Sequence, residues 1–380
     1  MQYDLLIVGG GPCGLSAALS ASKRGLQVLC IERKESPGYP VRCAEGIGKF
    51  LLPFLPYKIP KNIFRREIKG VHFWHDNFDI IQKGSYYEGF TIDRIDLEKW
   101  LCDCAIKSGA VILFGHEVIS FFKNDNNYKV LAKVGGKEIF FNSKKILFCD
   151  GADSKFLQEL DFKLDGTDLI NVCSWKVNQI DLEEPDYEQV IFSKNFANGY
   201  GYIFPKTTSS ANIGVGEVNC SLASLKKKLF SMIRSKPFLN QFKHANFIAE
   251  QSKSARFGGG PKIMRVGDIP FCGDAANINF KPLIEGILPA IIAGNAAGIF
   301  FAENRDIQSY SHYIESNLPQ WNENIKLNEI MGKLFEKNID NSLSLFTLCS
   351  GLLNMKSILE FSNRKIDEQI ELCKLLMQSK

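Results

Sequence analysis

One glycine pattern near the N-terminus constrains the fold of this chain more than any other feature. The apolar run Asp4–Val8 has the length and composition of a buried parallel strand, and it leads directly into the motif formed by Gly9, Gly11 and Gly14. Apolar residues then recur at helical spacing, and Gln27–Ile31 is the next apolar run. The order of strand, glycine turn, helix and strand predicts a βαβ unit that binds the diphosphate of a dinucleotide.

Each glycine of this motif has a distinct physical role. Gly9 permits the tight turn, Gly11 lets the backbone approach a diphosphate, and Gly14 lets the helix pack closely on the strand. Glu32 ends the second strand, where its carboxylate can accept hydrogen bonds from both hydroxyls of an adenosine ribose, and Arg33 beside it is a further predicted cofactor contact. Because Glu32 would repel a 2′-phosphate, the motif predicts FAD or NAD rather than NADP.

Two later strands end in turns that carry an aspartate. One strand ends in an Asp-Gly turn at Asp150, and a later strand ends in a Gly-Asp turn at Asp274. Both turns should emerge at the carboxyl edge of the sheet, where open α/β folds bind ligands. An aspartate there can bond the ribityl chain, which FAD has and NAD lacks. The helix that begins at Gly286 and Ile287 would direct its N–H groups toward the edge of the flavin ring, so the sequence favours FAD.

The apolar strand patterns occur in three separated blocks, with aromatic, strand-rich stretches between them. This arrangement predicts an α/β fold: an FAD-binding, Rossmann-like domain of the glutathione-reductase type, with an inserted antiparallel β-sheet that forms a substrate lobe, and C-terminal helices. The predicted units are an FAD-binding domain of residues 1–60, 93–165 and 255–305, a substrate lobe of residues 61–92 and 166–254, and a C-terminal helical segment of residues 306–380.

Some elements are predicted individually. Gly135-Gly136 should form the turn of a hairpin between Tyr128–Val134 and Lys137–Asn142, and Lys145–Cys149 should be a separate short strand. The segment Ser224–Phe242 is predicted as a helix pair that is split at Pro237.

Composition excludes several functional classes. The 46 Lys and Arg residues exceed the 42 Asp and Glu residues by only 4, which is too little to predict nucleic-acid binding. Eleven cysteines without a Cys-x-x-Cys pair favour a reducing, cytoplasmic location, and the histidine spacing gives no reason to expect a metal. The apolar segment Leu343–Leu353 would suit a helix that faces a membrane or a second subunit, which leaves peripheral membrane association open, although a cap packed on the FAD-binding domain is the favoured interpretation.

Three further segments carry a resemblance to a known family. They are Pro40–Gly48, the pattern Tyr-x-Tyr-x-Phe-Pro-Lys at Tyr200–Lys206 followed by Asn212–Gly216, and Gly273–Ile287. Together with the glycine motif they resemble the FAD-dependent geranylgeranyl reductases, which include the digeranylgeranylglycerophospholipid reductases. These belong to the wider flavoprotein group of the para-hydroxybenzoate hydroxylase type. The resemblance extends over most of the chain.

The chain departs from the family pattern at two positions. Tyr202 replaces the usual Trp, and Ile284 replaces the glycine that normally precedes Glu-Gly-Ile. The family's cofactor contacts would carry over to Cys13, Glu32, Cys43, Ala44, Gly46, Arg94, Val118, Asp274, Gly286 and Ile287. Arg94 would pair with the diphosphate. The aromatic lobe would provide an apolar wall for a lipid, with predicted substrate contacts at Tyr200, Tyr202, Phe204 and Pro205.

The resemblance implies an oxidoreductase that reduces C=C bonds of a prenyl lipid by hydride transfer from reduced FAD. Cys43 would donate the proton or shape the pocket. Since the sequence holds one dinucleotide motif, electrons would come from NAD(P)H that docks transiently or from an external donor. An FAD-dependent monooxygenase is the main alternative, and a non-catalytic flavin-binding electron carrier is a lesser one.

Overall fold

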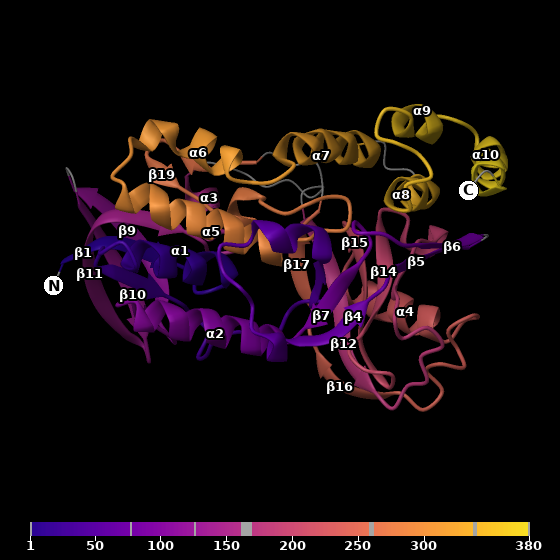
Figure 1. The fold of residues 1–380 in the computed structure, drawn as a ribbon, viewed down its shortest axis with the longest axis horizontal. Coiled ribbons are helices and arrows are strands. Elements are labelled where there is room, and N and C mark those ends of the chain that lie inside the picture. The colour runs from indigo at the N-terminus through magenta and orange to yellow at the C-terminus, as the bar shows by residue number, and fades with distance from the viewer. Residues whose placement is uncertain are drawn as a thin grey trace.

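The chain folds around two β-sheets that lie at opposite ends of the molecule (Figure 1). The computed structural model describes residues 2–76, 78–124, 127–160, 169–257, 262–336 and 340–378. The first sheet has six strands in the order β8 (Val111–Leu113), β2 (Val28–Ile31), β1 (Gln2–Val8), β11 (Lys137–Phe148), β10 (Asn127–Val134) and β9 (Glu117–Asn124). The strands from β8 to β11 are parallel, while β10 and β9 are antiparallel to their neighbours. The predicted α/β class is confirmed.

Strand β11 differs from its prediction. The sequence suggested a hairpin strand and a separate parallel strand, but Lys137–Phe148 is one strand of 12 residues. Its first half pairs with β10 across the turn at Gly135 and Gly136, where φ is +53° and +83°. Its second half pairs with β1, from Asn142 opposite Gln2 to Phe148 opposite Val8. The two halves form one strand because Asn142 and Ser143 pair with β1 on one side and with β10 on the other.

Two helices with closely packed backbones cover the parallel strands. Every residue of α1 (Pro12–Ser22) is buried, and α5 (Ile287–Ala302) lies beside it. A Cβ atom added to Gly294 would lie 2.1 Å from the carbonyl oxygen of Cys13, and one added to Gly298 would lie 2.0 Å from Ser20 Oγ. Small residues therefore set the spacing between the two helices. The flanking helix α2 (Arg94–Lys107) is capped by Asp93.

The second sheet has eight strands. Seven lie in the order β16 (Asn246–Glu250), β12 (Leu169–Asn178), β15 (Ser210–Val218), β14 (Gly199–Pro205), β13 (Glu188–Ile191), β5 (Val71–His75) and β6 (Phe78–Gln82), and β17 (Lys253–Arg256) also pairs with β12. All pairs are antiparallel except β13 with β5. Short remaining elements are β18 (Arg265–Val266), β19 (Ile269–Pro270) and α3 (Lys155–Glu159).

A third sheet, of three strands, combines a strand of the predicted FAD-binding domain with two strands of the predicted substrate lobe. It contains β3 (Gly46–Gly48), β7 (Gly89–Ile92) and β4 (Phe64–Ile68), all antiparallel. The stretch 61–92 therefore contributes β4 and β7 to a sheet with β3, and only β5 and β6 to the eight-stranded sheet. The predicted domain limits stay a prediction, and the limit between 165 and 166 lies outside the described residues.

The predicted helix pair at Ser224–Phe242 is wrong in its second half. One helix, α4 (Leu222–Ile233), covers the eight-stranded sheet, and the chain forms only turns after Pro237. Phe238 and Phe242 are buried there in the cluster beneath α4. The predicted second helix is absent, and the two buried aromatic side chains hold this stretch in place instead.

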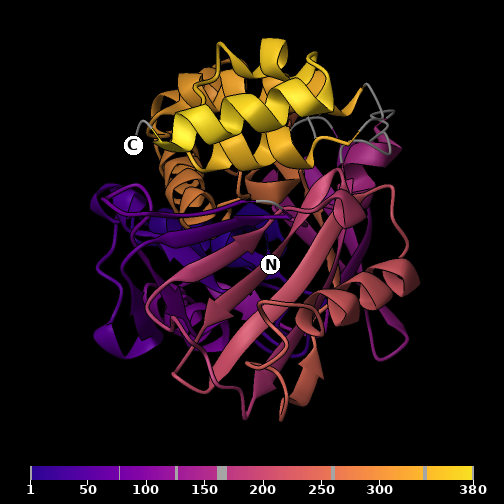
Figure 2. The ribbon, with the colours of Figure 1, turned by 90° about the vertical axis from the view of Figure 1, so that its right-hand side faces the viewer.

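Among the described residues, five α-helices follow α5, and the last of them lie over the eight-stranded sheet. In Figure 2 the last of them lie across the top of that sheet. They are α6 (Tyr310–Ser316), α7 (Trp321–Phe335), α8 (Ser342–Cys349), α9 (Ile358–Ser362) and α10 (Ile366–Gln378). Helix α8 is entirely buried, and its Phe346 ring packs against Phe78 and Phe192 of the lobe. The segment is therefore a cap, but on the lobe rather than on the FAD-binding domain.

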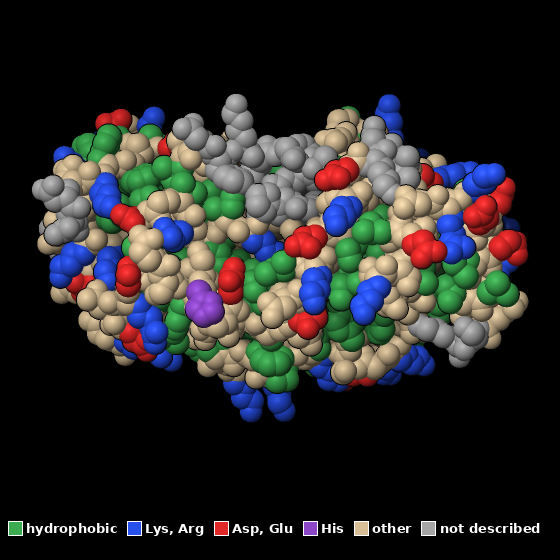
Figure 3. Space-filling view, turned by 90° about the horizontal axis from the view of Figure 1, so that it is seen from above, with side chains coloured by type: hydrophobic (Ala, Val, Ile, Leu, Met, Phe, Trp, Pro, Cys, Tyr) green, Lys and Arg blue, Asp and Glu red, His purple; other side chains and the backbone are tan. Residues whose placement is uncertain are grey.

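The surface above these helices mixes the two charge signs. Figure 3 shows Lys and Arg side chains interspersed with Asp and Glu, with hydrophobic side chains between them. Among the helices of the described residues, none combines the length and the apolar composition that crossing a bilayer requires.

Candidate active site

Three strand ends meet at one edge of the first sheet. The Gly9 N–H donates to the Ile31 carbonyl oxygen at 2.8 Å, and the Cys149 N–H donates to the Val8 oxygen at 2.7 Å. The predicted strand at 269–272 is regular only over β19, after which Phe271 forms a single parallel bridge with Phe148. These contacts bring the glycine turn, the Asp-Gly turn and the Gly-Asp turn together.

The glycine turn has the geometry that diphosphate binding requires. Gly9 has φ +104°, and a Cβ on Gly14 would lie 1.9 Å from the Gly9 carbonyl oxygen. A Cβ on Gly11 would meet no atom within 4 Å. Gly9 and Gly14 are thus required by the fold itself, whereas Gly11 leaves open space before the first turn of α1, where an anion is favoured.

Glu32 lies at the end of β2 and holds this turn in place. Its buried carboxylate accepts hydrogen bonds from the Gly10 N–H at 2.6 Å and the Lys34 N–H at 2.8 Å. The chain after β8 also passes here, since the His116 N–H donates to the Glu32 carbonyl oxygen at 3.0 Å. Val118, two residues later, is buried.

Replacing Glu32 tests this part of the site. We expect Glu32→Ala to weaken FAD binding about 100-fold, because charge-assisted hydrogen bonds contribute roughly 1.5–3 kcal/mol each. Flavin absorbance per mole of purified protein, and an FAD titration of the apoprotein, measure the loss. Glu138→Ala, at an exposed position of β11, is the matched control. A variant as yellow as the control would contradict the role of Glu32.

Asp150 has a carboxylate oxygen that the described residues leave without a hydrogen-bond partner. Its Oδ1 is buried, and burial raises the pKa of Asp150 to about 6. On the other side of the edge, Asp274 lies beside the start of α5, with Oδ1 3.4 Å from the Cβ position of Gly286. Three features fit FAD. Gly11 leaves room for a diphosphate, Glu32 places a carboxylate where the ribose would bind, and Asp150 has a buried oxygen that can accept a hydrogen bond from the ribityl chain.

The start of α5 contains the departure at Ile284. This β-branched residue has φ +58°, a left-handed conformation that glycine adopts readily. Phe280 and Glu285 exchange backbone hydrogen bonds of 2.8 and 3.0 Å around the turn. A glycine, as in the family pattern, would adopt this turn conformation without strain.

A buried charged network holds the Pro40–Gly48 segment against the lobe. Glu45 has φ +66°, and its carboxylate accepts from Lys206 Nζ at 2.8 Å, Asn212 Nδ2 at 2.7 Å and the Arg94 N–H at 2.7 Å. Asn212 also donates to the Ala44 carbonyl oxygen at 2.9 Å. These contacts fix Cys43 relative to β14. Sequence reasoning missed this role, although Glu45, Lys206 and Asn212 all lie within the quoted motifs.

Arg94 lies beside Cys43. Its Nε donates to Glu98 Oε1 at 2.5 Å, and the other oxygen of that buried carboxylate accepts from the Gly38 N–H. Burial works against the charged guanidinium, but Glu98 and Cys43 raise the pKa of Arg94 overall. Arg94 is therefore a permanent cation near the thiol. The predicted contact with the diphosphate stays a prediction.

The two halves of the aromatic signature pair with each other across strands. In the register of β14 and β15, Phe204 lies opposite Asn212, Tyr202 opposite Gly214 and Tyr200 opposite Gly216. A Cβ on Gly214 would lie 2.5 Å from the Tyr202 ring, so the ring lies over the glycine. Alternation in a strand places the three aromatic side chains on one face of the sheet.

Other contacts fix the ends of this signature. Tyr202 Oη donates to Ser174 Oγ at 2.8 Å, and Tyr200 Oη donates to the Leu283 carbonyl oxygen at 3.0 Å. The Pro205 carbonyl oxygen accepts from Thr91 Oγ1 at 2.6 Å. The strand that bears the predicted substrate contacts is therefore tied both to β7 and to the segment before α5.

The predicted aromatic wall is narrower than the sequence suggested. Phe73 and Phe192 are fully buried in the core under α8, and Trp175 packs with Phe247 on the side of α4. These side chains fill the interior of the lobe. The aromatic side chains on the face near Cys43 are those of Tyr200, Tyr202 and Phe204.

Six residues from four parts of the chain meet beside the signature, and each remains partly exposed. We call them the flavin-side cluster: Cys43, Gly46, Glu188, Phe204, Glu285 and Gly286. The Cβ position of Gly46 lies 2.9 Å from the Phe204 ring and 2.6 Å from Glu188 Oε1, and Glu285 Oε2 accepts from the Gly48 N–H at 3.0 Å. Burial raises the pKa of Glu285 to about 7.

The predicted site residues thus fall into two groups along the sheet edge. Those at the glycine turn and the strand ends near it are Gly9, Gly11, Cys13, Gly14, Glu32, Arg33, Val118 and Asp150. Those nearer the lobe are Cys43, Ala44, Gly46, Arg94, Asp274, Gly286, Ile287, Tyr200, Tyr202, Phe204 and Pro205. Sequence reasoning missed Glu188 and Glu285. Within the described residues, no three His, Cys, Asp or Glu side chains are arranged to hold a metal ion.

Comparison with known proteins finds similar flavoproteins and reductases. Residues 4–55 match the FAD binding domain family. The chain is 27% identical to a digeranylgeranylglycerophospholipid reductase of Thermoplasma volcanium, over 89% of this chain and 91% of that one. It is 28% identical to the enzyme of the same name from Thermoplasma acidophilum, over 81% and 80%. The predicted resemblance to the geranylgeranyl reductases is confirmed.

Solved structures show the same fold. A geranylgeranyl bacteriochlorophyll reductase-like protein of Thermoplasma acidophilum superposes with a TM-score of 0.73 at 24% identity, covering 98% of this chain and 95% of that one. A flavin-dependent brominase superposes with a TM-score of 0.71 at 17% identity, covering 99% and 93%. The fold is therefore shared by flavoproteins of different chemistry.

Proposed function

We propose that this chain is an FAD-dependent oxidoreductase that reduces C=C bonds in the geranylgeranyl groups of a lipid. The observation that carries the proposal is the aromatic signature, whose two halves pair in register and place Tyr200, Tyr202 and Phe204 on the face that adjoins Cys43. Similarity to reductases of such lipids over most of the chain supports it. Bound FAD, once reduced, supplies the hydride.

The chain's own residues bind and orient the cofactor. The N–H groups at the start of α1 would hold the diphosphate next to Gly11, Glu32 would accept from the ribose hydroxyls, and Asp150 and Asp274 would accept from the ribityl chain. The Pro40–Gly48 segment and the start of α5 would flank the flavin ring. This arrangement would leave the ring's open side toward β14.

The lobe residues exclude water and align the prenyl chain. Tyr200, Tyr202 and Phe204 present ring faces to an apolar substrate, and hydrogen bonds from both tyrosine hydroxyls fix their rings. Cys43, held by the Glu45 network, either donates a proton or shapes the pocket. A rigid apolar wall beside the flavin suits a hydride acceptor without polar groups.

The electron donor follows from what the chain contains. Its sequence has one dinucleotide motif, which FAD would occupy. We infer that NAD(P)H docks transiently near the flavin, or that an external carrier delivers the electrons. Stopped-flow flavin reduction with NADH, NADPH and dithionite separates these sources, since only a usable donor bleaches the flavin rapidly.

Product analysis tests the function. FAD-loaded protein is reduced with dithionite without oxygen and mixed with a geranylgeranyl lipid, and the products are weighed by mass spectrometry. We expect lipids that have gained pairs of hydrogens. A product that gains oxygen, formed only in air, would support a monooxygenase. The fold alone does not decide between the two reactions, because one fold can host several chemistries. If the lipid is unchanged and the protein keeps its flavin, the result would support a non-catalytic electron carrier.

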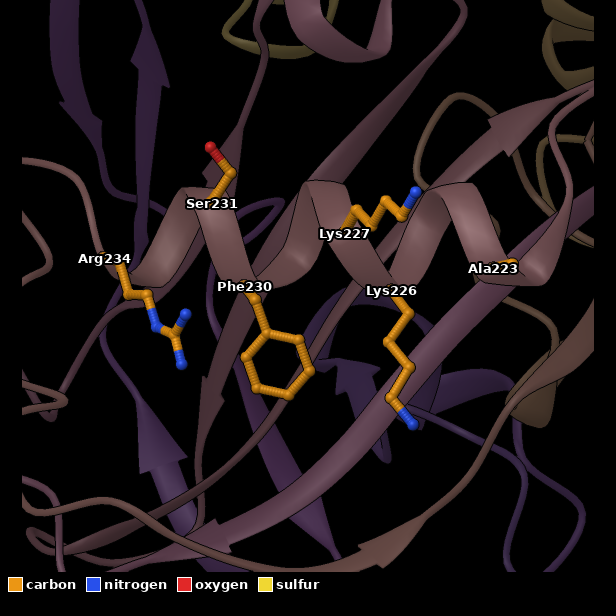
Figure 4. A pocket seen from close by; sticks show the side chains of 6 residues that line it. All are labelled: Ala223, Lys226, Lys227, Phe230, Ser231 and Arg234. Atoms are coloured by element: carbon orange, nitrogen blue, oxygen red, sulfur yellow. The ribbon is translucent and has the colours of Figure 1, made fainter.

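A lipid substrate raises the question of how the protein reaches a membrane, and we infer that the outer face of α4 makes the contact. A hollow of about 610 Å³ on this face is lined by Ala223, Lys226, Lys227, Phe230, Ser231 and Arg234. Figure 4 shows Lys226, Phe230 and Arg234 extending to the same side of the helix. Cations around an apolar ring suit the surface of an anionic bilayer, where each contributes about 1 kcal/mol.

Charge reversal on α4 tests this contact. We expect Lys226→Glu/Arg234→Glu to lower binding to phosphatidylglycerol vesicles at least about 30-fold, because two attractive charges become repulsive. Co-sedimentation measures the binding. Lys133→Glu/Lys137→Glu, on the hairpin of β10 and β11, is the matched control at the other end of the molecule. Equal binding by both variants would contradict the inference.

A further inference from the structure

We propose that Glu188 donates the proton that completes reduction of the lipid double bond. This inference rests on the proposed function, because it names the second reactant group of the same site. Glu188 belongs to none of the sequence motifs, and its placement in the fold is what identifies it.

The strand register directs Glu188 toward the flavin-side cluster. In β13, Val190 lies opposite Tyr202 and Gln189 lies opposite Ile203 of β14. Alternation along both strands therefore places Glu188 on the same face as Tyr202 and Phe204. Its neighbours on that face include Val71 of β5, Val190 of β13 and the aromatic side chains of β14, so a carboxyl group there serves no evident packing purpose.

Glu188 reaches the segment that carries Cys43. Its Oε1 lies 2.6 Å from the position that a Cβ on Gly46 would occupy. Any side chain at residue 46 would displace the carboxyl group, so glycine at this position makes room for it. Gly46 and Glu188 come from different sheets, and their contact brings the acid beside the predicted flavin contacts.

The carboxyl group has no compensating cation next to it. Among the described residues, no hydrogen bond or ion pair to the Glu188 side chain is found. The titratable groups that interact with it are Glu285 and Tyr200. The nearby carboxylate of Glu45 is paired with Lys206 at 2.8 Å. An isolated carboxyl group among apolar and acidic neighbours is stable in its protonated form.

The pKa of Glu188 agrees with this geometry. Burial, and then the neighbouring Glu285, raise the pKa of Glu188 from its ordinary value of 4.5 to about 8. At neutral pH the group therefore holds a proton that it can give up. A general acid works best when its pKa lies near the working pH.

The reaction step balances with this donor. The alkene π bond breaks as one carbon accepts the hydride that reduced FAD supplies and the adjacent carbon accepts the proton from the Glu188 carboxyl group. Two C–H bonds form, the flavin becomes oxidised, and Glu188 is left as a carboxylate. Because Glu188 is partly exposed, water can return its proton before the next turnover.

Single-turnover rates test the proposal. FAD-loaded, dithionite-reduced wild-type protein and the variants Glu188→Gln, Cys43→Ala and Glu183→Gln are mixed with a geranylgeranyl lipid without oxygen, and flavin reoxidation is followed. We expect Glu188→Gln to slow reoxidation about 100-fold or more, the usual contribution of a general acid. Glu183→Gln, an exposed position on the same lobe, should react like the wild type. Cys43→Ala should react at least ten times faster than Glu188→Gln.

Thermal unfolding gives a second readout that needs no substrate. Between about pH 5 and pH 8 the folded protein keeps the Glu188 proton while the unfolded chain releases it, so this group lowers stability as pH rises. Glu285 acts in the same direction, which is why the comparison is with a variant. We expect the Tm of Glu188→Gln relative to wild type to increase from pH 5 to pH 8.5. Glu183→Gln should show no such trend.

The possible results separate the two proposals. If wild-type protein is not reoxidised by the lipid, the proposed function fails and the role of Glu188 fails with it. If wild-type protein reacts and Glu188→Gln reacts equally fast, only the role of Glu188 is overturned. A slow Glu188→Gln whose relative Tm is independent of pH would also overturn it, since the residue would then hold no proton to donate.

Discussion

Gly11→Ala is expected to give a folded protein without bound flavin. Gly11 has φ −78° and ψ −174°, a conformation that alanine adopts readily, and the added Cβ would meet no protein atom within 4 Å. The only structure that the methyl group should displace is the diphosphate, which approaches the backbone at this glycine. We expect FAD affinity to fall at least about 100-fold, or roughly 2.7 kcal/mol. Flavin titration of the apoprotein and circular dichroism measure both properties.

The neighbouring glycine provides the matched comparison. In Gly14→Ala the Cβ would lie 1.9 Å from the Gly9 carbonyl oxygen, so α1 could not pack on β1. This variant should lose both flavin and cooperative unfolding, whereas Gly11→Ala should lose flavin alone. A yellow Gly11→Ala protein with wild-type affinity would show that the diphosphate does not bind at this turn.

The second large effect is expected when the buried charged network is broken. The side chains of Glu45 and Lys206 are only 4% and 7% exposed and pair at 2.8 Å. Burial lowers the pKa of Lys206, which shows how strongly desolvation opposes its charge. Lys206→Met would leave the Glu45 carboxylate buried beside only neutral donors. We expect the free energy of unfolding to fall by about 3–5 kcal/mol, measured by urea denaturation.

A double variant distinguishes the ion pair from simple packing. Glu45→Gln/Lys206→Met removes both charges and should recover most of the stability that Lys206→Met loses, because no charge remains buried without a partner. If the single and double variants are equally unstable, the loss comes from the shape of the site rather than from an uncompensated carboxylate.

The nucleotide-binding half of the site could be predicted from the sequence because its determinants are local. Gly9, Gly11 and Gly14 are consecutive members of one turn, and Glu32 ends the next strand. Because a short stretch of chain fixes their relative positions, the motif alone predicts the geometry of the turn. The paired aromatic signature could be recognised for a similar reason, since Phe204 and Asn212 are joined by a tight turn between β14 and β15.

Other features depend on contacts between distant segments, which a local pattern does not contain. The length of β11 depends on the pairing of its second half with β1, more than 130 residues earlier in the chain. Helix α8 is mostly apolar, which predicts burial but not the surface that buries it, and the lobe provides that surface. In the second half of the segment 224–242 the sequence predicted a helix that does not form. Phe238 and Phe242 are nevertheless buried in the core, in a stretch of turns.

Glu188 illustrates the strongest limit of sequence reasoning. A single acidic residue at the start of a strand has no distinguishing pattern, and most such residues are solvated. Its position follows from three separate pairings: β13 with β14, β13 with β5, and the approach of Gly46 from another sheet. Only the assembled fold brings its carboxyl group to Gly46 and Glu285.

The decisive measurement is the absorbance of the reduced, FAD-loaded protein after addition of a geranylgeranyl lipid in the strict absence of oxygen. We expect the oxidised flavin spectrum to return, with one flavin reoxidised for each double bond saturated. A flavin that stays reduced in the presence of the lipid, yet reoxidises at once in air, would contradict it.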